Sequence, residues 1–166
     1  MKVKPYLIIS HLLPGCFFLL ISLLAYEKWD FEKIKTAIKG LESTSLIGFG
    51  IILLIAAFLF GEIFDSARDG ALEWIFEKLS GKKVRWDFFY DQQDEVKLAR
   101  LEEYFFTWYV FNLNTAMALI AGGVVSLHNL DGMTYNHSFI VYWSIAIVLL
   151  FLDALILRRD LIKHSQ

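Results

Sequence analysis

The chain has 166 residues, of which 57% are hydrophobic and only 20% are charged. A soluble domain usually carries about a quarter charged residues, so this much apolar surface has no soluble partner to bury it. The net charge of −2 does not favour direct nucleic-acid binding, and a single cysteine, Cys16, excludes internal disulfides and cysteine-rich zinc sites. Composition therefore predicts a membrane protein in contact with the lipid bilayer, without a metal or other cofactor.

Four stretches of the chain are long and apolar enough to cross a bilayer, which requires about 20 residues of helix. None of them contains Lys or Arg, whose charge would be costly in lipid. They comprise residues 6–26, 46–64, 104–127 and 139–157. We therefore predict an all-α membrane protein, with a single domain over residues 1–166 in which four transmembrane helices form an antiparallel bundle.

The first span contains Pro14 followed by Gly15, which together predict a kink because proline removes a backbone hydrogen bond. After this span, residues 30–42 have helical periodicity with Asp30 as the expected N-cap. Apolar positions alternate there with Lys and Glu, so we expect a helix lying flat on the outer membrane surface.

Helical patterning in the second span continues past the expected lipid boundary as far as Ser80 and Gly81. Its acidic residues fall on one arc, and its apolar residues fall on the opposite arc. With a second extension that precedes the third span, this predicts a cytoplasmic helical hairpin over residues 65–103. The acidic arc is either an ordinary solvated face or a docking surface for a basic partner. The candidate partner-binding residues are Asp65, Asp69, Glu73 and Glu77 on the arc and Lys82, Lys83, Arg85 and Trp86 at the tip.

Basic residues are distributed unequally between the two sides of the membrane. Twelve of the 16 lie in the N-terminus, the loop between the second and third spans, and the C-terminal tail. Because cytoplasmic loops are enriched in Lys and Arg, both termini are predicted to lie in the cytoplasm.

Ionisable and polar residues inside the spans form the second candidate site, since such residues are costly in lipid. They lie at similar predicted depths near the inner leaflet, where we expect them to converge as one polar layer. This layer comprises His11, Glu62, Thr107, Asn112 and Asp153. Three interpretations are open: mutual satisfaction of buried polar groups, an ion or proton path, or a ligand site with hydrolytic chemistry.

Short pieces of the sequence are similar to a pattern in small prokaryotic four-span proteins: residues 11–15 (HLLPG), Phe17-Phe18, residues 104–106 (YFF) and Asn112. The size and layout of the whole chain resemble the membrane subunits of antiviral defence operons, such as the membrane component of Kiwa. This resemblance implies a sensor or effector of the prokaryotic inner membrane that works with a cytosolic protein, and it assigns no catalytic residue.

Four spans in a chain of this length leave no room for a large soluble catalytic domain. The first hypothesis is a homo-oligomeric, non-enzymatic sensor or effector that couples to a cytosolic partner through residues 65–103 and opens a pore or perturbs the membrane. The second is a metal- or lipid-dependent membrane hydrolase that uses His11, Glu62, Asp65 and Asp69. The third is an anchor or assembly subunit without chemistry.

Overall fold

The computed structural model describes residues 8–26, 30–40, 43–82, 107–129 and 137–164. Within these ranges all of the regular structure is helical. Four helical segments are long and apolar enough to cross a membrane: Ile8–Tyr26, Ser45–Ser80, Thr107–Leu127 and Ile140–Lys163. The prediction of an all-α chain with four membrane-length helices is therefore confirmed.

The first of these segments begins with a π-helical turn, η1 (Ile8–Leu12), and continues as helix α2 (Leu13–Tyr26). The irregular turn directly precedes Pro14, which cannot donate an N–H and whose ring crowds the carbonyl of Ser10. The irregular turn lies before Pro14, a kink at Pro14-Gly15 itself stays a prediction, and the carbonyl of Ser10 is left available to another helix.

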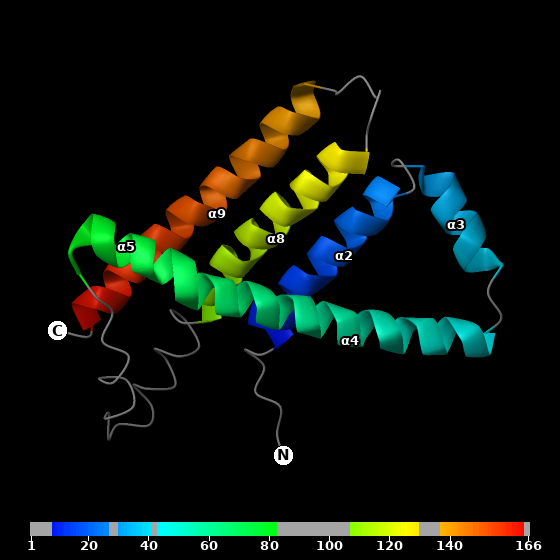
Figure 1. The fold of residues 1–166 in the computed structure, drawn as a ribbon, viewed down its shortest axis with the longest axis horizontal. Coiled ribbons are helices and arrows are strands. Elements are labelled where there is room, and N and C mark those ends of the chain that lie inside the picture. The colour runs from blue at the N-terminus through cyan, green and yellow to red at the C-terminus, as the bar shows by residue number, and fades with distance from the viewer. Residues whose placement is uncertain (1–7, 27–29, 41–42, 83–106, 130–136, 165–166) are drawn as a thin grey trace, which may run out of the picture.

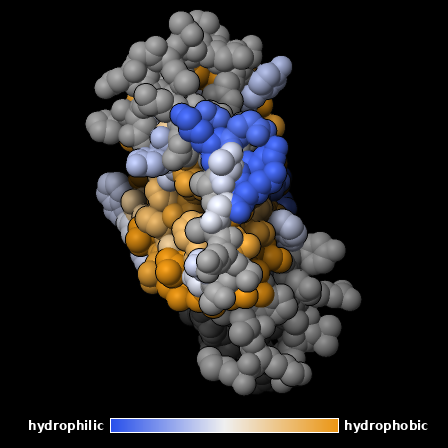
Figure 2. Space-filling view, turned by 90° about the vertical axis from the view of Figure 1, so that its right-hand side faces the viewer, coloured by the Kyte–Doolittle hydropathy of each residue, from blue (hydrophilic) through white to orange (hydrophobic). Residues whose placement is uncertain are grey.

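Helix α3 (Phe31–Lys39) is short and polar, and Figure 2 shows its hydrophilic surface beside an apolar belt. The carboxylate of Asp30 accepts a hydrogen bond of 3.2 Å from the backbone N–H of Lys33. Such a bond satisfies one of the free N–H groups at a helix start. The predicted helix and its N-cap are therefore confirmed.

The longest helical rod is built from α4 (Ser43–Ala67), the π-helical turn η2 (Arg68–Leu72) and α5 (Glu73–Ser80). It ends where predicted, because Gly81 adopts a left-handed conformation with φ of 62° and donates its N–H to the carbonyl of Glu77. At 1.5 Å per residue, the 36 residues of Ser45–Ser80 span about 54 Å, well beyond the roughly 30 Å of a hydrocarbon core.

Helices α8 (Thr107–Asn129) and α9 (His137–His164) complete the fold. Figure 1 shows α2, α8 and α9 side by side as one layer, whereas α4 crosses that layer obliquely. This crossing differs from the aligned packing of a regular four-helix bundle, and a fully antiparallel bundle stays a prediction.

Two glycines allow α4 to approach the first segment closely. A Cβ atom at Gly15 would overlap the backbone of Ala57, and one at Gly61 would overlap the backbone of His11. Gly122 on α8 has a similar role against the side chain of Ile21, where a Cβ would lie 2.7 Å from Cγ2. By contrast, Gly48 and Gly50 face open space. Close helix contacts are therefore made at Gly15, Gly61 and Gly122, but not at Gly48 or Gly50.

Several predictions fall on parts of the chain outside the described residues. These are the second arm of the hairpin, the start of the third span at residues 104–106, and the tip residues Lys83, Arg85 and Trp86.

Candidate functional site

The first polar cluster joins the N-terminal turn to α4. His11 is buried, and its Nε2 atom lies 3.5 Å from Oδ2 of Asp65 and 3.8 Å from Oε1 of Glu62. Glu62 and Asp65 are three residues apart, which places both on the same face of α4. The predicted meeting of His11 with Glu62 is thus found, with Asp65 as the nearer of its two acidic neighbours.

Asn114 of α8 closes this cluster from a third helix. Its Nδ2 atom donates to the carbonyl of Ser10 at 2.9 Å and to Oδ1 of Asp65 at 3.2 Å. The Ser10 carbonyl is the one that an N–H at position 14 would bind in a regular α-helix, and Pro14 has none. A neighbouring helix therefore satisfies the group freed by proline, as the absence of water in lipid requires.

Arg68 neutralises the acidic side of the same cluster. Its Nη1 atom lies 2.7 Å from Oδ1 of Asp65, and its Nη2 atom donates to Oδ1 of Asp69 at 2.6 Å. The guanidinium is buried, with 5% of the side chain exposed. Transferring a charged group from water into the protein interior costs several kcal/mol, so a buried guanidinium needs an anionic partner close to it. Asp65 thus contacts three helical segments through His11, Arg68 and Asn114.

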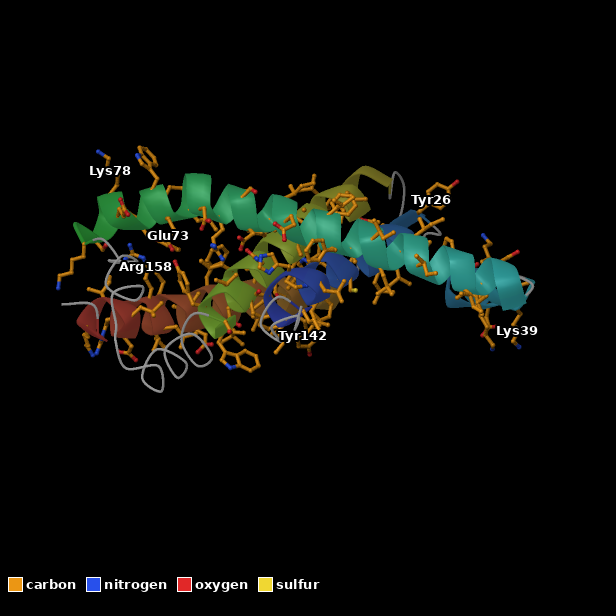
Figure 3. All side chains as sticks on the ribbon, turned by 90° about the horizontal axis from the view of Figure 1, so that it is seen from below. Tyr26, Lys39, Glu73, Lys78, Tyr142 and Arg158 are labelled. Carbon is orange, nitrogen blue, oxygen red and sulfur yellow. The ribbon has the colours of Figure 1, made fainter. Side chains whose placement is uncertain are left out.

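A second cluster lies further along the rod and joins α5 to α8 and α9. The hydroxyl of Tyr109 donates to Oε1 of Glu73, and Nε of Arg158 lies 3.5 Å from Oε2 of the same carboxylate. All three residues are buried, with relative exposures of 0% for Tyr109, 8% for Glu73 and 3% for Arg158. Figure 3 shows Glu73 and Arg158 on facing sides of their helices.

Arg158 also holds the end of α5. Its Nη1 atom donates to Oγ of Ser80 at 3.2 Å, and its Nη2 atom donates to the carbonyl of Lys82 at 3.1 Å. Its guanidinium lies 5.6 Å from the ring centroid of Phe76. One cation of α9 therefore connects to a carboxylate, a hydroxyl and a carbonyl of the preceding rod, which fixes the α5 terminus against α9.

A third contact joins the two remaining members of the predicted layer. Nδ2 of Asn112 donates to Oδ2 of Asp153 at 2.5 Å, which links α8 to α9. Thr107 is buried near the start of α8. The members of the predicted layer thus form two contacts, His11 with Glu62 and Asn112 with Asp153.

The orientation of the acidic arc corrects the sequence-based expectation. We expected Asp65, Asp69, Glu73 and Glu77 to form one outward face, yet Glu73 is buried and Asp65 is engaged by three partners. On the opposite, apolar arc Ile63 and Trp74 are 57% and 61% exposed, whereas Phe64 is buried. The two arcs therefore do not divide into one inward and one outward face: Glu73 turns inwards to the cation of Arg158, whereas Asp69 is 63% exposed.

Helices α2 and α8 carry buried side-chain oxygens without hydrogen-bond partners among the described residues. They are Oγ of Ser22, Oδ1 of Asn114, Oγ1 of Thr115 and Oγ of Ser126. Asn114 meets Ser10 at one end of the contact between the first segment and α8, and Gly122 meets Ile21 towards the other. The first segment and α8 therefore pack along most of their length, and we call this contact the α2–α8 seam.

The chemistry open to the first cluster is limited by access. Oγ of Ser10 lies 2.6 Å from Nδ1 of His11, and His11 contacts Asp65, so hydroxyl, imidazole and carboxylate are aligned. A nucleophile must reach its substrate, however, and only 1% of Ser10 is exposed. No group of three or more His, Cys, Asp or Glu suited to a metal ion occurs in the part of the chain that the structure describes.

Sequence reasoning missed four members of these clusters: Ser10, Arg68, Tyr109 and Arg158. For Arg68 the signal was available, because Asp65 lies three residues earlier and such pairs are neighbours on a helix. Ser10 is adjacent to its partner His11 and lies four residues before Pro14, whereas no local spacing indicates the partners of Tyr109 and Arg158. The contact between Glu73 and Tyr109 separates its members by 36 positions, and that between Ser80 and Arg158 by 78.

Comparison with known proteins gives no relative. No protein-family model matches the chain, and neither does any curated protein or solved structure.

Proposed function

We propose that this chain is a homo-oligomeric sensor or effector of the prokaryotic inner membrane that lets ions cross when it is triggered. The observation that carries the proposal is the position of the first polar cluster at one end of the α2–α8 seam. Charged and ionisable side chains inside membrane helices are expensive, and they commonly mark ion or proton pathways. The two helices of the seam also carry buried side-chain oxygens without partners among the described residues.

In the resting state, Asp65 is held by Arg68, His11 and Asn114, and it closes the end of the seam. Loss of these contacts would release a carboxylate and a guanidinium at the entrance to the seam. Hydroxyl oxygens along the seam would then coordinate the passing ion in place of its water ligands. Because a single layer of helices is too thin to enclose a wide pore, conduction would involve a narrow path or several copies of the chain.

Coupling to the cytoplasm would pass through residues 65–103, with both termini on the cytoplasmic side as the distribution of Lys and Arg favours. Arg158 supports this proposal, since it ties the end of α5 to α9. A partner that pulls on Lys82, Lys83, Arg85 and Trp86 would therefore act on the second cluster. The similarity in layout to membrane subunits of antiviral defence operons favours a role of this kind in defence.

Ion flux into proteoliposomes tests the proposal directly. A trapped pH-sensitive dye reports proton entry, and Asp65→Asn serves as the opened form because it weakens the pairing with Arg68. We expect more flux through Asp65→Asn than through the wild type. Adding Thr115→Val should remove most of that flux, whereas adding Ser144→Ala, on the exposed side of α9, should not. Absence of flux through both wild type and Asp65→Asn would contradict the pathway and favour a non-conducting anchor.

Co-purification from cells tests the coupling. A variant in which serine replaces Lys82, Lys83, Arg85 and Trp86 should no longer recover a cytosolic partner. The control variant, in which serine replaces Lys33 and Lys35 of α3, should still recover it. Equal recovery from both variants would place partner binding elsewhere.

The hydrolase alternative receives less support from this geometry. Three of its four residues, His11, Glu62 and Asp65, come together, whereas Asp69 pairs with Arg68. The only nucleophile beside His11 in the described cluster is Ser10, and it is enclosed.

A further inference from the structure

The outward side of α5 carries a pocket that none of the clusters above uses. Its volume is about 280 Å³, and it is lined by Trp74, Glu77, Lys78, Gly81 and Lys82. Figure 3 shows Lys78 pointing away from the α9 side of the rod, where Glu73 meets Arg158. The pocket therefore lies on the face of α5 opposite the second cluster.

The walls of this pocket are held by contacts already described. Lys78 is placed by the indole of Trp74, since its Nζ atom lies 5.9 Å from the ring centroid. The backbone at Lys82 is fixed by Arg158 of α9, and the turn before it is fixed by the N–H of Gly81 on the carbonyl of Glu77. Two ammonium groups are thus presented from an ordered helix end, against the single carboxylate of Glu77.

The surface around the pocket is apolar on the side of the helix. Ile75 and Leu79 of α5 are both exposed, at 39% and 80%, and so is Trp74. Tryptophan is enriched at the membrane–water interface. A lysine at the same depth can place its aliphatic chain along apolar surface and its ammonium group among the lipid headgroups. The distribution of basic residues places this end of the rod on the cytoplasmic side, where anionic lipids are concentrated.

We propose that this pocket binds the phosphate of an anionic phospholipid of the cytoplasmic leaflet, with Lys78 and Lys82 at the phosphate and the acyl chains along Ile75 and Leu79. The ligand is an anion because the lining carries two cations and one carboxylate. A choline headgroup is disfavoured, since Lys78 already occupies the neighbourhood of the Trp74 ring that a quaternary ammonium would need.

Native mass spectrometry of the full-length protein in detergent tests this site, with phosphatidylglycerol and phosphatidylcholine supplied in equal amounts. We expect the wild type to retain phosphatidylglycerol preferentially. The double variant Lys78→Gln/Lys82→Gln should bind it about 25-fold more weakly, since each basic residue near an anionic surface contributes roughly fivefold in affinity. The matched control is Lys33→Gln/Lys35→Gln, which removes the same charge from α3 and should retain wild-type binding.

Three results would overturn the proposal. Equal weakening in both double variants would indicate a general effect of charge, and equal retention of both lipids by the wild type would exclude an anionic site. Release of bound phosphatidylglycerol by millimolar inorganic phosphate would identify a site for free phosphate instead. If the glutamine variant fails to fold, Lys78→Arg/Lys82→Arg supplies the test: it should keep the preference, and loss of preference in that folded variant would contradict phosphate binding.

Discussion

Residues 46–59 and residues 62–80 belong to one helical rod, yet they meet their surroundings in opposite ways. In the first stretch nearly every side chain is apolar and exposed, and Ala57 is the only buried residue. In the second stretch, buried Arg68 and Glu73 face the other helices, whereas Ile63 and Trp74 face outwards. A soluble amphipathic helix has its apolar face inside. Paired charges therefore attach this half of the rod to the fold together with apolar contacts, since Phe64 is buried against Phe18 and both Leu72 and Phe76 pack on the hydrophobic core.

The comparison predicts that breaking an ion pair in the second stretch has the largest effect on stability. Arg158→Met should lower the free energy of unfolding by about 3–5 kcal/mol, because it leaves the carboxylate of Glu73 buried without its cation. Unfolding in mixed micelles with increasing SDS, followed by circular dichroism, measures the change. Arg159→Met, at an exposed position on the same helix, should cost less than about 0.5 kcal/mol.

A second substitution checks the mechanism of that loss. Adding Glu73→Gln to Arg158→Met should recover much of the stability, since no unpaired charge then stays buried. If the double variant is less stable than Arg158→Met alone, the charge of Glu73 is not the cause.

The next largest effect is expected where the rod crosses the first segment. Gly61→Ala should cost about 1–3 kcal/mol, because its Cβ would overlap the backbone of His11 and force the helices apart. Gly48→Ala, in the first stretch, meets nothing within 4 Å and should instead gain up to about 1 kcal/mol from helix propensity. The same SDS titration compares them, and a stabilising Gly61→Ala would show that the crossing is not close.

A smaller effect is expected at the hydrogen bond between α8 and α9. A double-mutant cycle with Asn112→Ala and Asp153→Asn should give a coupling of about 0.6–1.7 kcal/mol, the range for interhelical hydrogen bonds in membranes. Additive losses in the two single variants would mean that the pair makes no net contribution in the bilayer.

The smallest effect is expected in the first stretch of the rod. Leu54→Ala should change stability by less than about 0.5 kcal/mol, because the side chain is 54% exposed and lipid replaces its contacts. Leu113→Ala on α8 is the matched comparison, with a fully buried side chain, and should cost at least about 2 kcal/mol. Equal losses at the two leucines would show that another chain covers the exposed stretch.

Much of the site could be anticipated from single residues but not from their pairing. His11 and Glu62 were expected to meet because polar groups in spans at similar depth have few other partners, and they do meet. Asn112 and Asp153 were expected in the same layer, but they form a separate contact. Pro14 leaves the carbonyl of Ser10 without its usual helical donor, and only the structure shows that the side chain of Asn114 donates to it.

The sequence by itself determined the helices: their apolar lengths, the N-cap at Asp30, and the end of the rod at Gly81. These features depend on the local balance between side-chain solvation and backbone hydrogen bonding, which neighbouring residues set. Only the tertiary structure decided which face of residues 62–80 turns inwards. Periodicity separates an acidic arc from an apolar arc, but it does not say which solvent lies outside, and the direction was fixed by cations and amides from distant parts of the chain.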